Sequence, residues 1–137
     1  MTAVIDSSIT LARLYDDERT EIVERVFEKV IVEGAWVPVI WRLEVANGLQ
    51  QGIRQCRIDG SFRAGALADL VGLDIAIDPE TNVHAWTITL DLAECFRLTL
   101  YDASYLELAQ RRGLPLATLD NELCAAARQL DVELLGR

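Results

Sequence analysis

Residues 101–120, YDASYLELAQRRGLPLATLD, decide the predicted fold because they contain a helix and a strand with clear boundaries. The helix is predicted to begin near Asp102 and to end at Gly113, since glycine commonly terminates a helix. A short apolar run, Leu116–Leu119, follows the glycine and is predicted to be a buried strand. The acid Asp120 comes directly after this strand. The stretch is typical of the second half of a strand–helix–strand unit.

Predicted helices and strands alternate along the rest of the chain as well. Between residues 22 and 31, apolar side chains recur at helical spacing along one face, and Gly34 follows as a stop signal. Further helices are predicted near Ser8 and over about 40–54, 61–70, 80–95 and 122–130. The predicted strands are Ala3–Ile5, Ala35–Val37, Asp74–Ile77, Leu116–Leu119 and Val132–Leu135. This alternation predicts an α/β fold, with a parallel sheet of about five strands flanked by helices on both faces.

The length of 137 residues suits a single domain over residues 1–137, and no linker, repeat or low-complexity tract divides it. No run approaches the roughly 18 consecutive apolar residues of a membrane helix. The N-terminus lacks the basic leader of a signal peptide. We therefore expect a cytoplasmic protein with no membrane partner. The three cysteines form no CxxC pair and there is one histidine, so a zinc site is not expected.

The formal net charge is −9, from 22 acidic and 13 basic residues. A field of this sign argues against binding nucleic acid through overall charge. It is typical of proteins that bind cations or a basic partner, and of many acidic proteins that do neither. The arginines considered for RNA contact are Arg13, Arg42, Arg97, Arg111 and Arg112, with surface solubility as the alternative for each.

Three acids fall where an open parallel sheet binds its ligands, outside the carboxyl ends of the strands. Asp6 follows the first predicted strand, and Asp120 follows the Leu116–Leu119 strand. Asp102 begins the helix that leads into that strand, which places it at the same edge. Glu44 lies one turn inside the helix that follows the second strand. We expect the four carboxylates to lie close together.

Each acid also has a simpler explanation. Asp6, Asp102 and Asp120 all stand at predicted helix starts, where an aspartate commonly caps the first turn. Glu44 shares a polar stripe with Asn47, which is typical of a solvated helix face. The functional interpretation depends on one edge of one sheet receiving all four acids.

Four carboxylates at one place need a cation. Two of them about 4 Å apart repel by roughly 4 kcal/mol at an effective dielectric of about 20. A set of oxygen ligands without histidine or cysteine favours Mg²⁺ or Mn²⁺ over zinc. Such an ion polarises a phosphoryl oxygen and activates bound water, and it turns an acidic hollow into one that attracts phosphate.

Four segments in this order resemble the PIN-domain family, and among its members the toxins of VapBC-type toxin–antitoxin pairs. The resemblance covers almost the whole chain. The segments are Val4-Ile5-Asp6-Ser7-Ser8, Pro38 with Trp41-Arg42-Leu43-Glu44-Val45-Ala46-Asn47, Tyr101-Asp102-Ala103-Ser104-Tyr105, and Pro115-Leu116-Ala117-Thr118-Leu119-Asp120.

The resemblance implies an endoribonuclease that depends on Mg²⁺, with Mn²⁺ as a substitute, and hydrolyses RNA with metal-activated water. By matching position, Asp6 and Asp102 are the principal metal ligands, and Glu44 and Asp120 complete the acidic pocket. Thr118 and Asn47 match supporting positions. The resemblance also implies a homodimer and a small DNA-binding antitoxin with a basic or apolar tail. Glu122 departs from the family pattern and is interpreted as a first-turn residue of its helix.

Two other functions compete with this hypothesis. Asp6, Ser8 and Thr10 form a D-x-S-x-T pattern that resembles metal-dependent adhesion modules, but that pattern does not account for Glu44 or Asp102. A PIN-like scaffold that binds RNA or protein without cutting is the second alternative. RNA cleavage with Mg²⁺ or Mn²⁺ distinguishes the nuclease from both alternatives, and RNA binding without cleavage favours the scaffold.

Overall fold

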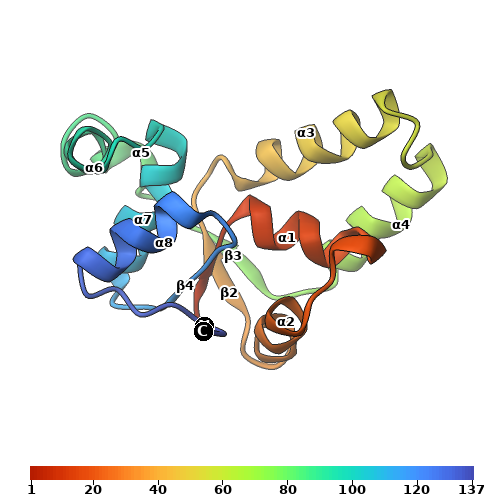
Figure 1. Ribbon diagram of the computed structural model, residues 1–137, viewed down its shortest axis with the longest axis horizontal. Coiled ribbons are helices and arrows are strands. Elements are labelled where there is room, and N and C mark those ends of the chain that lie inside the picture. The colour runs from red at the N-terminus through yellow and green to blue at the C-terminus, as the bar shows by residue number, and fades with distance from the viewer.

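A four-stranded parallel sheet forms the centre of the fold, in the order β3-β2-β1-β4 (Figure 1). The structure is a computed structural model that describes residues 1–137. The strands are β1 (Val4–Ile5), β2 (Ala35–Val37), β3 (Ile75–Ile77) and β4 (Leu116–Ala117). In the central strand, Val4 pairs with both Trp36 and Leu116. The strands are short and almost entirely apolar, as expected for a parallel sheet covered on both faces.

Helices cover both faces of the sheet. In Figure 1 the first four α-helices lie on one side of the strands and the last four on the other. The helices are α1 (Ser7–Leu14), α2 (Glu21–Glu33), α3 (Trp41–Arg54), α4 (Gly60–Val71), α5 (Thr81–His84), α6 (Ile88–Phe96), α7 (Leu100–Arg112) and α8 (Asn121–Gln129), with a short 3-10 helix, η1 (Asp16–Glu18). The predicted α/β fold with helices on both faces is confirmed.

The core forms where the apolar helix faces meet the sheet. The predicted face of α2 is buried through Val23, Val26, Phe27 and Val30, and Gly34 ends this helix. The most enclosed helix is α7, in which every residue from Ala103 to Ala109 is buried. It packs on β1 and lies between α6 and α8. Because α7 is held on several sides, the acid in its first turn has a well-defined position.

Two sequence predictions of secondary structure are wrong. Val132–Leu135 is not a strand: it forms one bridge, between Leu134 and Leu116, because the left-handed residues Asp131 and Gly136 bend the chain on both sides. The sheet therefore has four strands instead of five. The single helix predicted over 80–95 is two helices, because Thr87 takes a non-helical conformation (φ −121°, ψ −101°).

The break between α5 and α6 leaves Trp86 with 89% of its surface exposed, so it is not a core residue. The β-branched run Thr87–Thr89 disfavours a continuous helix at this point. None of the helices combines the length and the apolar character needed to cross a membrane.

Candidate active site

Asp6 is the most deeply buried of the four predicted acids, with 3% of its surface exposed. It follows β1 directly and is the N-cap of α1. Its Oδ1 accepts hydrogen bonds from the Ile9 backbone N–H at 3.0 Å and from the Ser8 hydroxyl at 2.7 Å. Its Oδ2 accepts a hydrogen bond from the Thr118 hydroxyl. These donors hold the carboxylate in one orientation.

Thr118 and Ser8 join two connections that are distant in sequence but adjacent in space. The Thr118 hydroxyl accepts a hydrogen bond from the backbone N–H of Asp120 at 3.0 Å, and the Ser8 hydroxyl accepts one from Leu119 N–H at 3.0 Å. The start of α1 and the β4–α8 connection therefore lie side by side, as Figure 1 shows. This contact exists because β1 and β4 are neighbours in the sheet.

The other three acids are half-buried and have carboxylate oxygens without a protein partner. Asp120 caps α8 by accepting from Leu123 N–H at 2.9 Å through Oδ1, which leaves Oδ2 free. Asp102 is not a cap, because Thr99 has that role in α7, and both Asp102 oxygens are free. Glu44, in the first turn of α3, accepts one hydrogen bond, from the Tyr105 hydroxyl.

The negative charges of these carboxylates affect one another's pKa values. The pKa of Asp102 is raised by burial first, and then by the negative charges of Asp120 and Glu44. Burial also raises the pKa of Asp6 to about 6, against the lowering effect of its hydrogen bonds, and the charge of Asp102 adds to the rise. Asp102 is therefore the carboxylate through which the other three are coupled.

Glu122 acts on the acidic site through its charge, whereas the predicted supporting residue Asn47 makes no hydrogen bond to it. Glu122 is exposed in the first turn of α8, as predicted, and its charge also raises the pKa of Asp102. Asn47 is exposed on α3 and makes no hydrogen bond to the four acids. Thr118 does contact the site, through Asp6.

Tyr105 and Ser8 contact the acids directly, although neither was predicted as a residue of the nuclease site. Tyr105 follows Asp102 by one helical turn, so the two residues share a face of α7. The spacing could have drawn attention to Tyr105, but its partner Glu44 is 61 residues away and could not be inferred. Ser8 lies in the first turn of α1, where a helix was predicted to begin, and it belongs to the D-x-S-x-T pattern.

The donor chemistry of the acidic site suits a divalent cation. All four side chains offer oxygen, and four oxygens have no protein partner: both of Asp102, Oδ2 of Asp120 and Oε2 of Glu44. Burial is the main cause of the raised pKa values of Asp6 and Asp102, and a cation would offset the like charges that add to the rise. No three acids, histidines or cysteines converge closely enough to hold an ion by themselves. Mg²⁺ commonly keeps several waters and is held by one or two carboxylates, and this requirement fits the arrangement.

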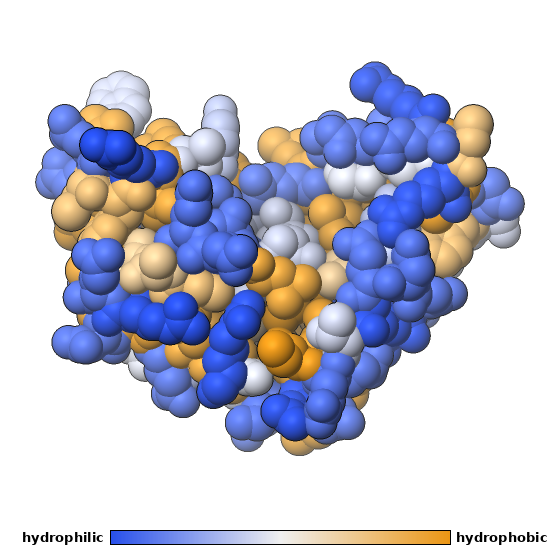
Figure 2. All heavy atoms as spheres, in the orientation of Figure 1, coloured by the Kyte–Doolittle hydropathy of each residue, from blue (hydrophilic) through white to orange (hydrophobic).

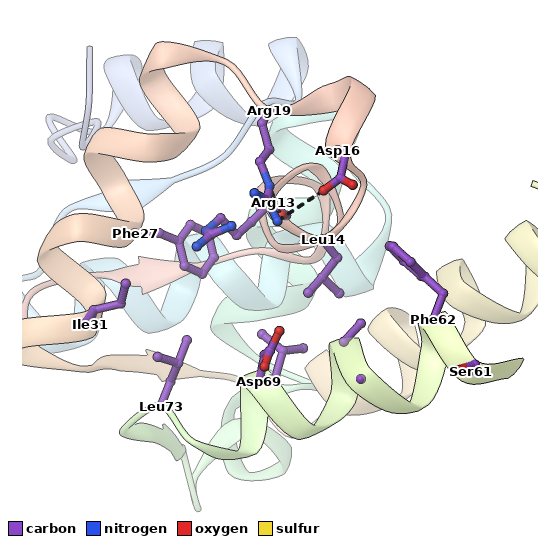
Figure 3. A pocket seen from close by; sticks show the side chains of 13 residues that line it. Arg13, Leu14, Asp16, Arg19, Phe27, Ile31, Ser61, Phe62, Asp69 and Leu73 are labelled. Atoms are coloured by element: carbon purple, nitrogen blue, oxygen red, sulfur yellow. Dashed lines mark hydrogen bonds and ion pairs between the residues drawn. The ribbon is translucent and has the colours of Figure 1, made fainter. Parts of the chain in front are cut away.

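The surface is hollowed between the lobe containing α5–α8 and the α3–α4 pair, as Figure 2 shows. A separate cavity of about 350 Å³ lies between α1, α2 and α4. Figure 3 shows apolar side chains such as Phe27 and Leu14 lining it, with the Arg19–Asp16 ion pair at its edge. None of the four acids borders this cavity.

Comparison with known proteins agrees with the fold. The structure is similar to the crystal structure of PAE2754 from Pyrobaculum aerophilum, with a TM-score of 0.68 and 25% sequence identity over 92% of this chain and 84% of that chain. No curated protein matches the chain significantly. The family model for the PIN domain matches residues 3–129. The chain therefore belongs to the PIN domain family.

Proposed function

We propose that this protein is a metal-dependent endoribonuclease that hydrolyses RNA phosphodiester bonds at the site formed by Asp6, Glu44, Asp102 and Asp120. PIN domains are a nuclease-type family and typically bind a divalent metal. The observation that carries the proposal is the placement of the acids at one edge of the sheet: the Thr118 hydroxyl bonds both Asp6 and the backbone N–H of Asp120, and the charges of Asp120 and Glu44 act on Asp102. A crowded acidic site of this kind is costly to a fold unless a cation uses it.

The residues have distinct roles in this proposal. Asp102 offers two free oxygens, and Asp120 and Glu44 offer one each, so these residues can supply ligands to a cation. Asp6 is held rigidly by Thr118, Ser8 and the start of α1, and it supplies a ligand of fixed orientation. When bound, Mg²⁺ or Mn²⁺ supplies a polarised phosphoryl oxygen and a water of lowered pKa. The cation also attracts the phosphate backbone, despite the net charge of −9.

The test is cleavage of RNA by wild type with Mg²⁺ or Mn²⁺, compared with Asp6→Asn and Asp102→Asn. We expect cleavage by wild type, none with EDTA, and loss in both variants. Asp91→Asn is the matched control, because Asp91 is exposed on α6 and makes no ion pair. Cleavage retained in both site variants would refute this site. RNA binding without cleavage by wild type would instead favour the scaffold function.

We further propose that the nuclease is the toxin of a toxin–antitoxin pair. The support is the resemblance of the four site segments and a net charge of −9, which suits a small DNA-binding antitoxin with a basic or apolar tail. The expected result is that expression of the chain slows growth and that co-expression of a short gene directly upstream relieves the effect. Growth unaffected by the active chain would contradict the toxin role.

For the homodimer, we propose contact through the surface of α5 and α6. Residues 81–90 contain no acidic residue and no lysine or arginine, so two acidic chains can meet there without bringing like charges together. The exposed apolar side chains of this surface are Val83, Trp86, Ile88 and Leu90. Light scattering is expected to give a dimer for wild type and a monomer for Trp86→Glu. A monomeric wild type would contradict the proposal.

A further inference from the structure

We propose that Tyr105 is a positioning residue for Glu44: its hydroxyl holds one carboxylate oxygen of Glu44 and leaves the other for the cation or its coordinated water. This inference rests on the proposed metal-dependent site. It adds a residue that acts through a ligand without itself contacting the reacting atoms.

The contact is specific in its geometry. The Tyr105 hydroxyl donates to Oε1 of Glu44 at 2.5 Å, and this is the only hydrogen bond to the Glu44 carboxylate. Oε2 therefore has no protein partner. Tyr105 itself is fully buried in α7, one turn beyond Asp102. A buried ring in a packed helix has little freedom, so its hydroxyl is a fixed point from which to orient a flexible glutamate.

The position of this hydrogen bond in the fold supports a role in the site. It is the only hydrogen bond between α3 and α7, two helices that otherwise make few contacts. It joins them beside Asp102, where the charge of Glu44 acts. Without it, nothing polar would hold the Glu44 carboxylate toward α7.

The hydroxyl is not needed for packing alone. A phenylalanine ring would fill the same buried volume, whereas a buried hydroxyl is unfavourable unless it is hydrogen-bonded. Among the hydrogen bonds of the structure, Glu44 is the acceptor that the Tyr105 hydroxyl uses. The polar group at this position therefore serves the carboxylate.

The experiment measures Mn²⁺ binding by calorimetry on the full chain, without RNA. Tyr105→Phe is expected to weaken binding about 10-fold or more, because removal of a group that orients a metal ligand typically costs 10–100-fold in affinity. Tyr15→Phe is the matched control: Tyr15 is also buried, and its hydroxyl donates to the Gly48 backbone carbonyl at 3.1 Å and to none of the four carboxylates. We expect it to bind Mn²⁺ within about twofold of wild type.

Two glutamate variants separate positioning from a general effect on the fold. In the Glu44→Gln background, Tyr105→Phe is expected to cause no further loss, because the charged ligand that it orients is already absent. Glu44→Asp keeps the charge but shortens the side chain, so it cannot contact both Tyr105 and the cation. Its binding is expected to be at least 10-fold weaker, and it tests the inference even if Tyr105→Phe does not fold.

The outcomes are distinct from those of the nuclease test. Equal effects of Tyr105→Phe and Tyr15→Phe, an undiminished effect in the Glu44→Gln background, or near wild-type binding by Glu44→Asp would each overturn the inference. If wild type cleaves RNA while Tyr105→Phe binds Mn²⁺ normally, the nuclease proposal stands and this one fails. If Mn²⁺ binding depends on Tyr105 but wild type cuts no RNA, the positioning role of Tyr105 stands and the nuclease proposal fails. A wild type that binds no Mn²⁺ overturns both.

Discussion

At the scale of single residues, Asp6 combines deep burial with a negative charge. Its pKa in the fold is about 6, against an ordinary value of 3.8, because burial disfavours the ionised form more than its hydrogen bonds favour it. The folded state therefore binds this proton more tightly than the unfolded state does. The contribution of Asp6 to stability is least favourable above about pH 6, and it improves as the pH falls through 6 toward 4.

We expect Asp6→Asn to increase the free energy of unfolding at pH 7 by about 1 to 3 kcal/mol in the absence of metal, because the buried charge is removed while asparagine can still cap α1. The gain should shrink toward pH 4. The measurement is urea unfolding in EDTA at several pH values, with Asp91→Asn as the exposed control. A variant that is less stable than wild type at pH 7 would show that capping by the ionised carboxylate outweighs its burial.

At the scale of elements, an ion cluster ties the C-terminal end of α7 to the turn after β3. Asp78 has 1% of its surface exposed and accepts hydrogen bonds from Arg111 at 2.7 Å and Arg112 at 2.9 Å. Burial acts to raise the pKa of Asp78, but the two arginines outweigh it, and the net pKa is lowered. Arg111 and Arg112, considered from the sequence as RNA contacts, are thus engaged within the fold.

We expect Asp78→Asn to destabilise the protein by about 2 kcal/mol or more at pH 7, because it leaves two partly buried arginines without their shared partner. For a carboxyl with a lowered pKa, the stabilisation is present above the ordinary value of 3.8 and is lost as the pH falls below it. The measurement is the difference in unfolding free energy between wild type and variant at pH 7 and pH 3. A difference that stays constant between these pH values would contradict the charge-based explanation.

The packing of α3 on α1 depends on glycines in α3. A Cβ at Gly52 would lie 2.1 Å from the Tyr15 hydroxyl, and one at Gly48 would lie 2.4 Å from Leu11. A residue as small as glycine lets the two helices approach, and α1 begins at Asp6 while α3 carries Glu44. The approach of these helices therefore helps to set the distance between two of the site acids.

We expect Gly52→Ala to lower the unfolding free energy by about 1 to 3 kcal/mol through overpacking, although alanine favours a helix by about 1 kcal/mol over glycine. Gly65→Ala in α4 is the matched control, because a Cβ there has no neighbour within 4 Å, and it should stabilise the protein. The measurement is the thermal unfolding of each variant, compared with that of wild type. Equal stabilisation by both substitutions would show that Tyr15 moves aside without cost.

At the scale of the whole molecule, the net charge is −9, and part of the negative charge acts on Asp102 from Asp120, Glu44 and Glu122. A cation that binds the folded state there stabilises it by about 2.7 kcal/mol when its concentration is 100 times its dissociation constant. We expect millimolar Mn²⁺ or Mg²⁺ to raise the melting temperature of wild type by several degrees at pH 7. The effect should be much smaller for Asp102→Asn, and an equal rise in both would indicate non-specific charge screening.

The residue pattern alone predicted the strand–helix alternation and the edge of the sheet where Asp6, Asp102 and Asp120 lie. It could do so because helical and strand periodicities are local, and because parallel strands end at a common edge. The isolated bridge at Leu134 and the break at Thr87 escaped prediction, because left-handed residues cause the first and a β-branched run favours the second, and the apolar periodicity registers neither.

The contacts within the site were decided by the tertiary structure. The Thr118–Asp6 hydrogen bond requires β1 and β4 to be neighbours, and the Tyr105–Glu44 hydrogen bond requires α3 to approach α7. Segments 61 and 112 residues apart form these two bonds. The periodicity of a segment specifies which of its faces is buried, but the partner of each side chain depends on how the helices and strands pack together.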